Sequence, residues 1–222
     1  WALVGAGLVV SVATLAAVVA AGGLDHALGF IGDQTGRGLQ VEAPVSMFYL
    51  WGQMLGIPGF FVYYSTEILT FQVTGTEIDP VIASMTPILM IGVGAVAVVA
   101  ALKVRRGAAV RDLLPVAALA IVTVFIVLNK VGSPQYLCWL VPPVVLGLVV
   151  ARRAWVRPAI LVLVLSALTQ LVYPVFYGEV LAAHPLGVGI LTVRNALLIV
   201  LGVWMVVRLV RVPVRTPSSI PA

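Results

Sequence analysis

The first residues that could carry chemistry lie in the segment Arg37-Gly38-Leu39-Gln40-Val41-Glu42, where three polar side chains stand among apolar ones. On a helix Arg37 and Gln40, three residues apart, would share a face. Arg37 offers a planar fork of donors that suits phosphate. Gln40 can both donate and accept hydrogen bonds, as a sugar hydroxyl requires. The segment is therefore a candidate phosphate or sugar site, although an interfacial loop with an ordinary ion pair fits it as well.

The second candidate is the segment Asn129–Leu140 (NKVGSPQYLCWL), at a turn between two apolar runs. The turn and the helix start that follows it carry Asn129, Lys130, Ser133, Gln135, Tyr136 and Trp139. Tyr and Trp populate the interfacial belt of any membrane protein, and a lysine there can extend to the headgroups. These ordinary roles do not explain why so many polar residues occur in one tight turn. A functional role for the turn therefore remains an alternative.

Arg194 is a third and more isolated candidate, inside the last apolar run. A charged residue within a membrane is costly and marks a functional site by default. Near the interface, a side chain that extends to the headgroups explains it equally well. Both interpretations of Arg194 remain open.

The composition indicates what surrounds these candidates. Of 222 residues, 62% are hydrophobic, 13 are basic and 8 are acidic, and the mean hydropathy is +1.15. A soluble domain carries charge on about a quarter of its residues, so the natural solvent of this chain is lipid. The basic residues form short clusters between apolar runs, a pattern typical of orientation charges rather than of nucleic-acid binding.

Metal and cofactor chemistry finds no support in the sequence. His26 and His184 lie far apart, without the spacing of metal ligands. Cys138 is the single cysteine, which excludes an internal disulfide. Gly-rich phosphate loops, nucleophile elbows and HExxH motifs are absent. We expect no metal and no cofactor.

Apolar runs of about 20 residues predict spanning helices. The expected fold is all-α, a polytopic transmembrane helical bundle within residues 1–210. Its predicted helices cover about 1–22, 80–102, 113–128, 136–151, 158–175 and 187–207. Residues 211–222, rich in proline and serine, are expected to form a disordered cytoplasmic tail.

Loop charges predict the orientation of the bundle. Basic residues cluster at 103–111, at 152–157 and from Arg208 onward, whereas the loops 130–135 and 176–186 carry few. By the positive-inside rule the basic loops and the C-terminus are cytoplasmic and the other two loops face outward. We therefore expect a multi-pass protein of the cell membrane.

The segment 23–79 is harder to interpret. Its apolar stretch 43–64 is interrupted by Gly52, Gln53, Gly56, Pro58 and Gly59. Interrupted backbone at membrane depth is tolerated only where protein or a wet cavity covers it. We favour an outward-facing loop with a re-entrant or interfacial helix at 43–64 over a spanning helix, which would leave Arg37 on the cytoplasmic side.

Together the two motifs resemble a known family. Arg37–Glu42, followed by Lys130–Pro142 (KVGSPQYLCWLVP), is similar to the C-terminal half of bacterial, actinobacterial-like, polyprenol-phosphate-mannose-dependent mannosyltransferases of the GT-C superfamily. A similar Asn-Lys-Val…Gln-Tyr…Trp string occurs in the eukaryotic transferase that adds the first mannose to GPI anchors. The relatives carry a histidine shortly before the arginine, whereas this chain has Asp33-Gln34-Thr35-Gly36 there.

The resemblance implies an inverting membrane hexosyltransferase. Its donor would be a polyprenol-phosphate sugar, expected to be mannose, and its acceptor a lipid or glycan at the extracytoplasmic face. Such enzymes use a carboxylate base in the first outer loop, which we expect upstream of Trp1. On this expectation the chain is a C-terminal fragment, inactive alone.

The resemblance also implies roles for individual residues. Arg37 and Lys130 would stabilise the charge that develops on the leaving lipid phosphate. Sugar or phosphate oxygens would be held by Gln40, Glu42, Ser133, Gln135 and Tyr136. Trp139 would offer an apolar face to a sugar ring or to the first isoprene units, and Arg194 is a further possible member of the site.

Two other classes of function remain open. A lipid-linked-sugar flippase or another transporter would also carry polar residues within the membrane, and so would a non-catalytic subunit of a glycosyltransferase complex. Transporters show paired broken helices in internal repeats. This chain has one broken segment, 43–64, and no repeat.

Overall fold

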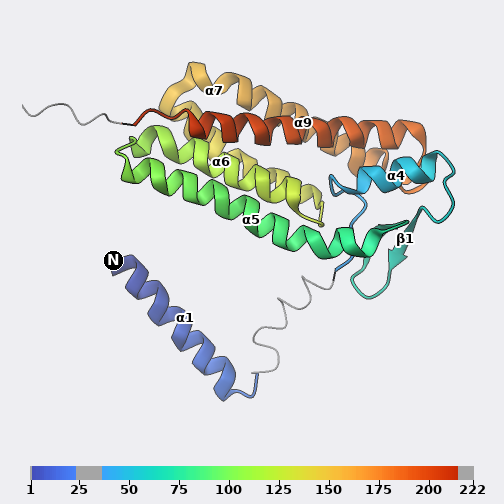
Figure 1. Cartoon of the computed structure of the whole chain (residues 1–222), viewed down its shortest axis with the longest axis horizontal. Coiled ribbons are helices and arrows are strands. Elements are labelled where there is room, and N and C mark those ends of the chain that lie inside the picture. Colours follow the sequence, from blue (N-terminus) through green and yellow to red (C-terminus); the bar gives the residue numbers. More distant parts are fainter. Residues whose placement is uncertain (1, 24–36, 215–222) are drawn as a thin grey trace, which may run out of the picture. The chain divides into compact units, whose positions relative to one another are not determined.

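The computed structural model describes residues 2–23 and 37–214, which belong to two compact units, Trp1–Arg37 and Gly38–Ala222 (Figure 1). In the first, α1 (Ala2–Ala20) is a 19-residue apolar helix, which agrees with the helix predicted at 1–22. The expectations for His26, for 33–36 and for most of the tail fall outside the described residues.

The second unit is mainly helical, as its hydropathy predicts. Four stretches in the described part of the chain are long and apolar enough to cross a membrane, and they suit a membrane protein. They are α5 (Ile78–Arg105), α6 (Val110–Leu128), the helical stretch Pro134–Val175, and α9 (Pro185–Val210). The helices α5, α6 and α9 each extend a few residues beyond the predicted helix in the same place, and the stretch Pro134–Val175 covers two predicted helices.

The stretch Pro134–Val175 contains three elements in succession. They are η1 (Pro134–Leu140, a 3₁₀ helix), α7 (Val141–Gln170) and η2 (Leu171–Val175, a π-helical turn). At Ala151 the backbone leaves helical geometry (φ −150°, ψ 65°). Gly147 lies directly against the Trp155 ring, although eight residues of straight helix would separate them by about 12 Å. The chain therefore folds back at Ala151 into two arms, in the place of the two predicted helices 136–151 and 158–175.

Helix α6 lies at the centre of the bundle, where it contacts α5, α7 and α9. Its Leu119 and Ala120 are completely buried among Leu165 of α7 and Leu198 of α9. Burial of such side chains removes apolar surface from solvent on every helix face that meets α6. This core fixes the ends of the helices, and so the positions of the loops between them.

Residues 38–77 form a small cap rather than one long helix. It contains α4 (Ser46–Met54), β1 (Phe61–Ser65) and β2 (Thr70–Thr74). The strands pair antiparallel with Phe61 opposite Thr74 and Ser65 opposite Thr70. Positive φ values at Gly56 and Gly59 turn the chain between α4 and β1.

One sequence expectation is corrected by this cap. The helix expected at 43–64 covers only Ser46–Met54, and a two-stranded hairpin follows it, so the mainly helical bundle carries a small β-element. The residues of β1, Phe-Val-Tyr-Tyr-Ser, are aromatic or β-branched in four of five cases, and such residues favour strands. Their apolar character alone does not distinguish a strand from a helix.

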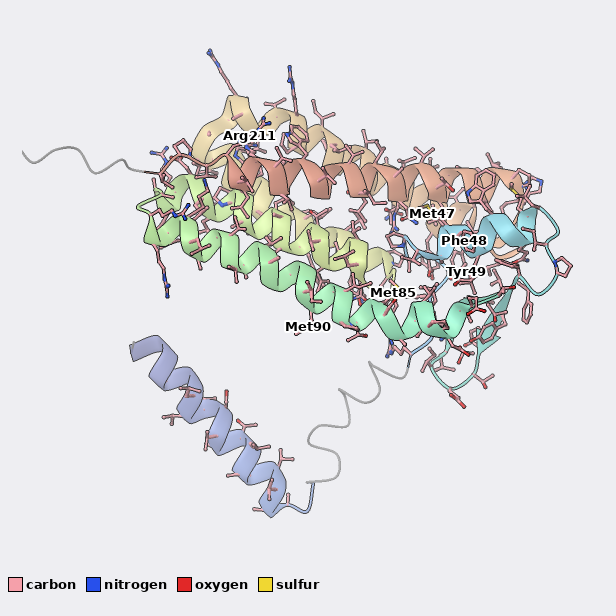
Figure 2. The ribbon with its side chains drawn as sticks, viewed as in Figure 1. Met47, Phe48, Tyr49, Met85, Met90 and Arg211 are labelled. Atoms are coloured by element: carbon pink, nitrogen blue, oxygen red, sulfur yellow. The ribbon has the colours of Figure 1, made fainter. Side chains whose placement is uncertain are left out.

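Basic side chains of the second unit bond to backbone carbonyls at one end of the bundle, which we call the basic end. Lys103 Nζ donates to Val212 O (2.8 Å), Arg111 Nη2 to Val150 O (3.2 Å), and Arg208 Nη1 to Ala154 O (3.2 Å). Figure 2 shows Arg211 at this end and Met47, Phe48 and Tyr49 of α4 toward the opposite end of α9. The cap and the turn 129–133 thus lie together at the end away from the basic loops (Figure 1).

Candidate functional site

The two sequence motifs, separated by 92 residues between Gln40 and Gly132, meet at the cap. The Gln40 backbone N–H donates to Lys130 O (3.0 Å). The Gly132 N–H donates to Gln40 Oε1 (2.9 Å). A Cβ at Gly132 would lie only 2.3 Å from the backbone carbon of Glu42 and the nitrogen of Ala43. The glycine is therefore required for this close approach of the two backbones.

The first motif is also joined to the β-hairpin. Gln40 forms a β-bridge with Gln72, and its Nε2 donates to Thr70 Oγ1 (3.0 Å). Val41 N bonds to Phe71 O (3.2 Å), while Val73 N bonds to Leu39 O (3.0 Å). The predicted helical face of Arg37 and Gln40 is absent, because residues 37–40 are not helical and Gln40 bridges to Gln72 of β2. Gln40 thereby connects the hairpin on one side with the turn 130–132 on the other.

An open cleft of about 530 Å³ lies where these segments meet. Its lining comes from the first motif, the hairpin, the second motif and the chain around η2 and α8 (Tyr177–Leu181). The lining residues are Gln40, Glu42, Tyr64, Leu69, Thr70, Phe71, Ser133, Pro134, Gln135, Tyr173 and Tyr177. Four of the predicted site residues, Gln40, Glu42, Ser133 and Gln135, thus line one cleft.

Glu42 is the buried acidic group of this cleft, with 3% of its surface exposed. The Tyr177 hydroxyl donates to its Oε1 (2.8 Å), while Oε2 is buried without a hydrogen-bond partner among the residues that the structure describes. Burial raises the pKa of Glu42, against the hydrogen bond from Tyr177, which lowers it. Burial and the adjacent Glu42 raise the pKa of Tyr177, so this phenol keeps its proton and acts as the donor.

Arg194 lies beneath the cleft rather than in it. Its side chain is 1% exposed, and its guanidinium donates to Glu42 O (3.2 Å), Asn195 Oδ1 (2.6 Å) and Thr169 Oγ1 (3.3 Å). A side chain extended to lipid headgroups would not make these bonds. Arg194 instead joins α9 and α7 to the backbone of the first motif and holds Glu42 in place.

A second groove of about 360 Å³ adjoins the cleft and shares Pro134, Gln135 and Tyr173 with it. The rest of its lining belongs to η1, α7 and η2: Leu137, Cys138, Val141, Ser166, Thr169, Gln170 and Pro174. A ligand with a polar head and an apolar chain could extend from the cleft along this groove.

The remaining predicted site residues lie elsewhere. The Tyr136 and Trp139 rings stack on each other (centroids 4.5 Å apart) and contact Phe125, and neither lines the cleft. Lys130 is 5% exposed and is tied to the first motif through its carbonyl. Arg37 belongs to the first unit. Their roles stay predictions.

Comparisons of the chain with protein-family models, with curated proteins and with solved structures found no match.

The sequence did not point to Tyr64, Phe71, Tyr173 and Tyr177, which line the cleft from the hairpin and from the α7–α8 junction. One signal was available for the last two, because two tyrosines four residues apart flank the start of a predicted outward loop. Tyr173 has extended backbone angles within η2 (φ −133°, ψ 118°), an irregularity that hydropathy does not reveal.

Proposed function

We propose that this chain binds the substrates of a membrane glycosyltransferase reaction that moves a sugar from a polyprenol-phosphate donor to a lipid or glycan acceptor. The observation that carries the proposal is the meeting of Gln40–Glu42 with Lys130–Gln135 at one cleft. Those are the two motifs by which the sequence resembles the polyprenol-phosphate-mannose-dependent transferases, and mannose is accordingly the proposed sugar.

The reaction explains why such a site belongs at the end of a helical bundle. The acceptor oxygen forms a bond to the anomeric carbon while the bond from that carbon to the phosphate oxygen breaks. The lipid phosphate leaves with increased negative charge, which a positioned cation stabilises. We assign this role to Lys130 and Arg37. The acceptor proton passes to a carboxylate base, a role that we assign to no residue of this chain.

Charge distribution supports an outward-facing site. The basic end carries Lys103, Arg111 and Arg208, and the positive-inside rule places such an end in the cytoplasm. The cleft then opens at the extracytoplasmic face of the cell membrane, where a lipid-linked sugar can reach it by lateral diffusion. The groove beside the cleft gives the donor's isoprenoid chain a path along η1 and α7.

Transfer from radiolabelled polyprenol-phosphate-mannose tests the proposal, in membranes that express the full-length protein. We expect Lys130→Ala and Arg37→Ala each to lower the transfer rate about tenfold or more, because each removes a charge that stabilises the transition state. Lys103→Ala and Arg111→Ala, which make the same changes at the basic end, should stay within about twofold of wild type.

Rates within about twofold of wild type for both Lys130→Ala and Arg37→Ala would contradict the assignment of these residues. Movement of labelled donor across sealed vesicles without a glycosylated product would contradict transfer itself and would indicate a lipid-linked-sugar flippase.

A further inference from the structure

The cleft has a wall of four aromatic rings in sequence. Tyr64 lies against Phe71 (centroids 5.0 Å apart), Phe71 against Tyr177 (6.0 Å), and Tyr177 against Tyr173 (5.0 Å). The interplanar angles of 60°, 76° and 82° are edge-to-face. Successive rings therefore turn in different directions, and their electron-rich faces suit the weakly positive C–H groups of a sugar ring.

The polar part of the lining is neutral apart from one carboxyl group. Gln40, Thr70, Ser133 and Gln135 contribute amides and hydroxyls. Of the lining residues that the structure describes, none carries a basic side chain. Phosphate is recognised through arginine, lysine or clustered backbone N–H groups, and the Glu42 carboxyl group would oppose an anion. The lining therefore favours an uncharged group, and on the proposed function the donor's phosphate would meet its cations outside this lining.

The pair formed by Tyr177 and Glu42 adds a directional contact. Because the Tyr177 hydroxyl donates its proton to Glu42 Oε1, its oxygen has lone pairs left to accept a bond from a ligand hydroxyl. Glu42 is itself fixed, since its carbonyl accepts from Arg194 and its backbone packs against Gly132. Glu42 is thus a positioning residue that orients the Tyr177 hydroxyl.

From these contacts we infer that the cleft binds a neutral pyranose unit. Its ring packs on the wall Tyr64–Phe71–Tyr177–Tyr173, and its hydroxyls bond to Tyr177 and to the amides of Gln40 and Gln135. The volume of about 530 Å³ lies within the usual range for small-ligand sites. The inference rests on the proposed function in one respect, that the pyranose belongs to a substrate of glycosyl transfer.

Saturation-transfer NMR tests the inference on the purified full-length protein in lipid nanodiscs, with methyl α-D-mannopyranoside as the probe. We expect saturation to reach the mannoside in wild type. Tyr177→Phe should weaken binding about three- to tenfold, because it removes one hydrogen bond to the ligand. Tyr63→Phe is the matched control, since the Tyr63 hydroxyl bonds to Gln72 Oε1 (2.7 Å) outside the cleft lining; it should leave binding unchanged.

Inorganic phosphate supplies the second probe. If the cleft selects a neutral sugar, phosphate at the same concentration does not displace the mannoside. Displacement by phosphate, absence of saturation transfer in wild type, or equal binding by Tyr177→Phe and wild type would each overturn the inference.

The role of Glu42 is tested with Glu42→Gln and Glu42→Ala. The amide can still accept the Tyr177 proton, so Glu42→Gln should retain mannoside binding within about twofold. Glu42→Ala leaves the Tyr177 hydroxyl without this partner and should approach the loss seen in Tyr177→Phe. Equal binding in both variants would remove Glu42 from the inference.

The transfer assay distinguishes the two sources of the sugar. Tyr177→Phe should raise the KM for polyprenol-phosphate-mannose if the donor's sugar occupies the cleft, and the KM for the acceptor if a glycan acceptor does. An unchanged KM for both substrates would overturn the inference while leaving the transferase proposal intact. If the protein binds the mannoside but transfers no sugar, the transferase proposal is contradicted and the pyranose site stands.

Discussion

At the basic end of the bundle, Lys103, Arg111 and Arg208 each donate to a single backbone carbonyl. At the cleft end, Glu42, Lys130 and Arg194 are at most 5% exposed. Their neighbours there include Tyr177, Asn195 and Thr169, which take part in side-chain hydrogen bonds. The same residue types are thus solvated or partly solvated at one end and almost completely desolvated at the other.

This difference bears on what each end does. Exposed charges contribute little to stability but orient a membrane protein through their number and position. Buried charges are costly to desolvate and are kept where they are paired and hydrogen bonded. The charges at the basic end thus suit a role in orientation, whereas Arg194 at the cleft end holds the backbone of the first motif through the Glu42 carbonyl.

The largest contrast is expected between Arg194→Leu and Arg111→Leu. The first change leaves the Glu42 carbonyl and Asn195 Oδ1 without their donor and removes the cation near Glu42, so it should lower the free energy of unfolding by about 3 kcal/mol. The second breaks an exposed bond to Val150 O and should cost less than about 1 kcal/mol. Thermal unfolding in detergent measures both, and equal losses would refute the contrast between the ends.

A smaller loss of stability is expected when a methyl group is added at Gly132, where the two motifs meet. Gly132→Ala places a Cβ 2.3 Å from the Glu42 and Ala43 backbones and should destabilise the protein by about 2 kcal/mol. It should also reduce mannoside binding. Gly94→Ala on α5 is the matched control, because no atom lies within 4 Å of its Cβ; it should be neutral or stabilising by up to about 1 kcal/mol. Similar melting temperatures for the two variants would count against the close packing of the motifs.

The smallest effect concerns pH. Because the folded protein raises the pKa of Glu42 above its usual 4.5, the stability associated with its protonated form is present below that value and is lost as pH rises through the folded pKa. Glu42→Gln should remove this dependence. We expect the melting temperature of wild type, relative to Glu42→Gln, to fall by a few degrees between about pH 4 and pH 8.

Glu67→Gln controls for the change of charge, since Glu67 is exposed in the hairpin turn. A pH profile of Glu42→Gln that parallels wild type would show that Glu42 does not titrate in this range.

The long helices could be predicted because a run of apolar residues needs no partner to be recognised. The turn between the two arms of α7 could also be predicted, from Arg152, Arg153 and Arg157. The hairpin could not, since the apolar residues of β1 suit either a strand or a helix. The strand conformation depends on contacts between β2 and the first motif, where Gln40 bridges to Gln72. Such a contact between distant residues cannot be inferred from the local sequence pattern.

The lining of the cleft could be predicted in part, because polar residues are conspicuous in an apolar chain. Polar residues are rare in this chain, so the sequence singled out Gln40, Glu42, Ser133 and Gln135. The structure brings these four residues to one cleft. Tyr177 was not singled out, because a tyrosine near a predicted interface is ordinary. Its hydrogen bond to Glu42 joins residues that are 135 positions apart in sequence. Tyr136 and Trp139 were prominent in the sequence, yet they stack on one another beside the cleft.

The origin of the cleft in four separated segments has a consequence for biosynthesis. Its walls come from residues 40–42, 64–71, 133–135 and 173–177, and the chain enters the membrane from its N-terminal side during translation. The earlier segments can be in place while the last still lies within the ribosome. A nascent chain therefore holds an incomplete cleft until residues 173–177 have been made, so all four walls are present only when most of the bundle is already synthesised.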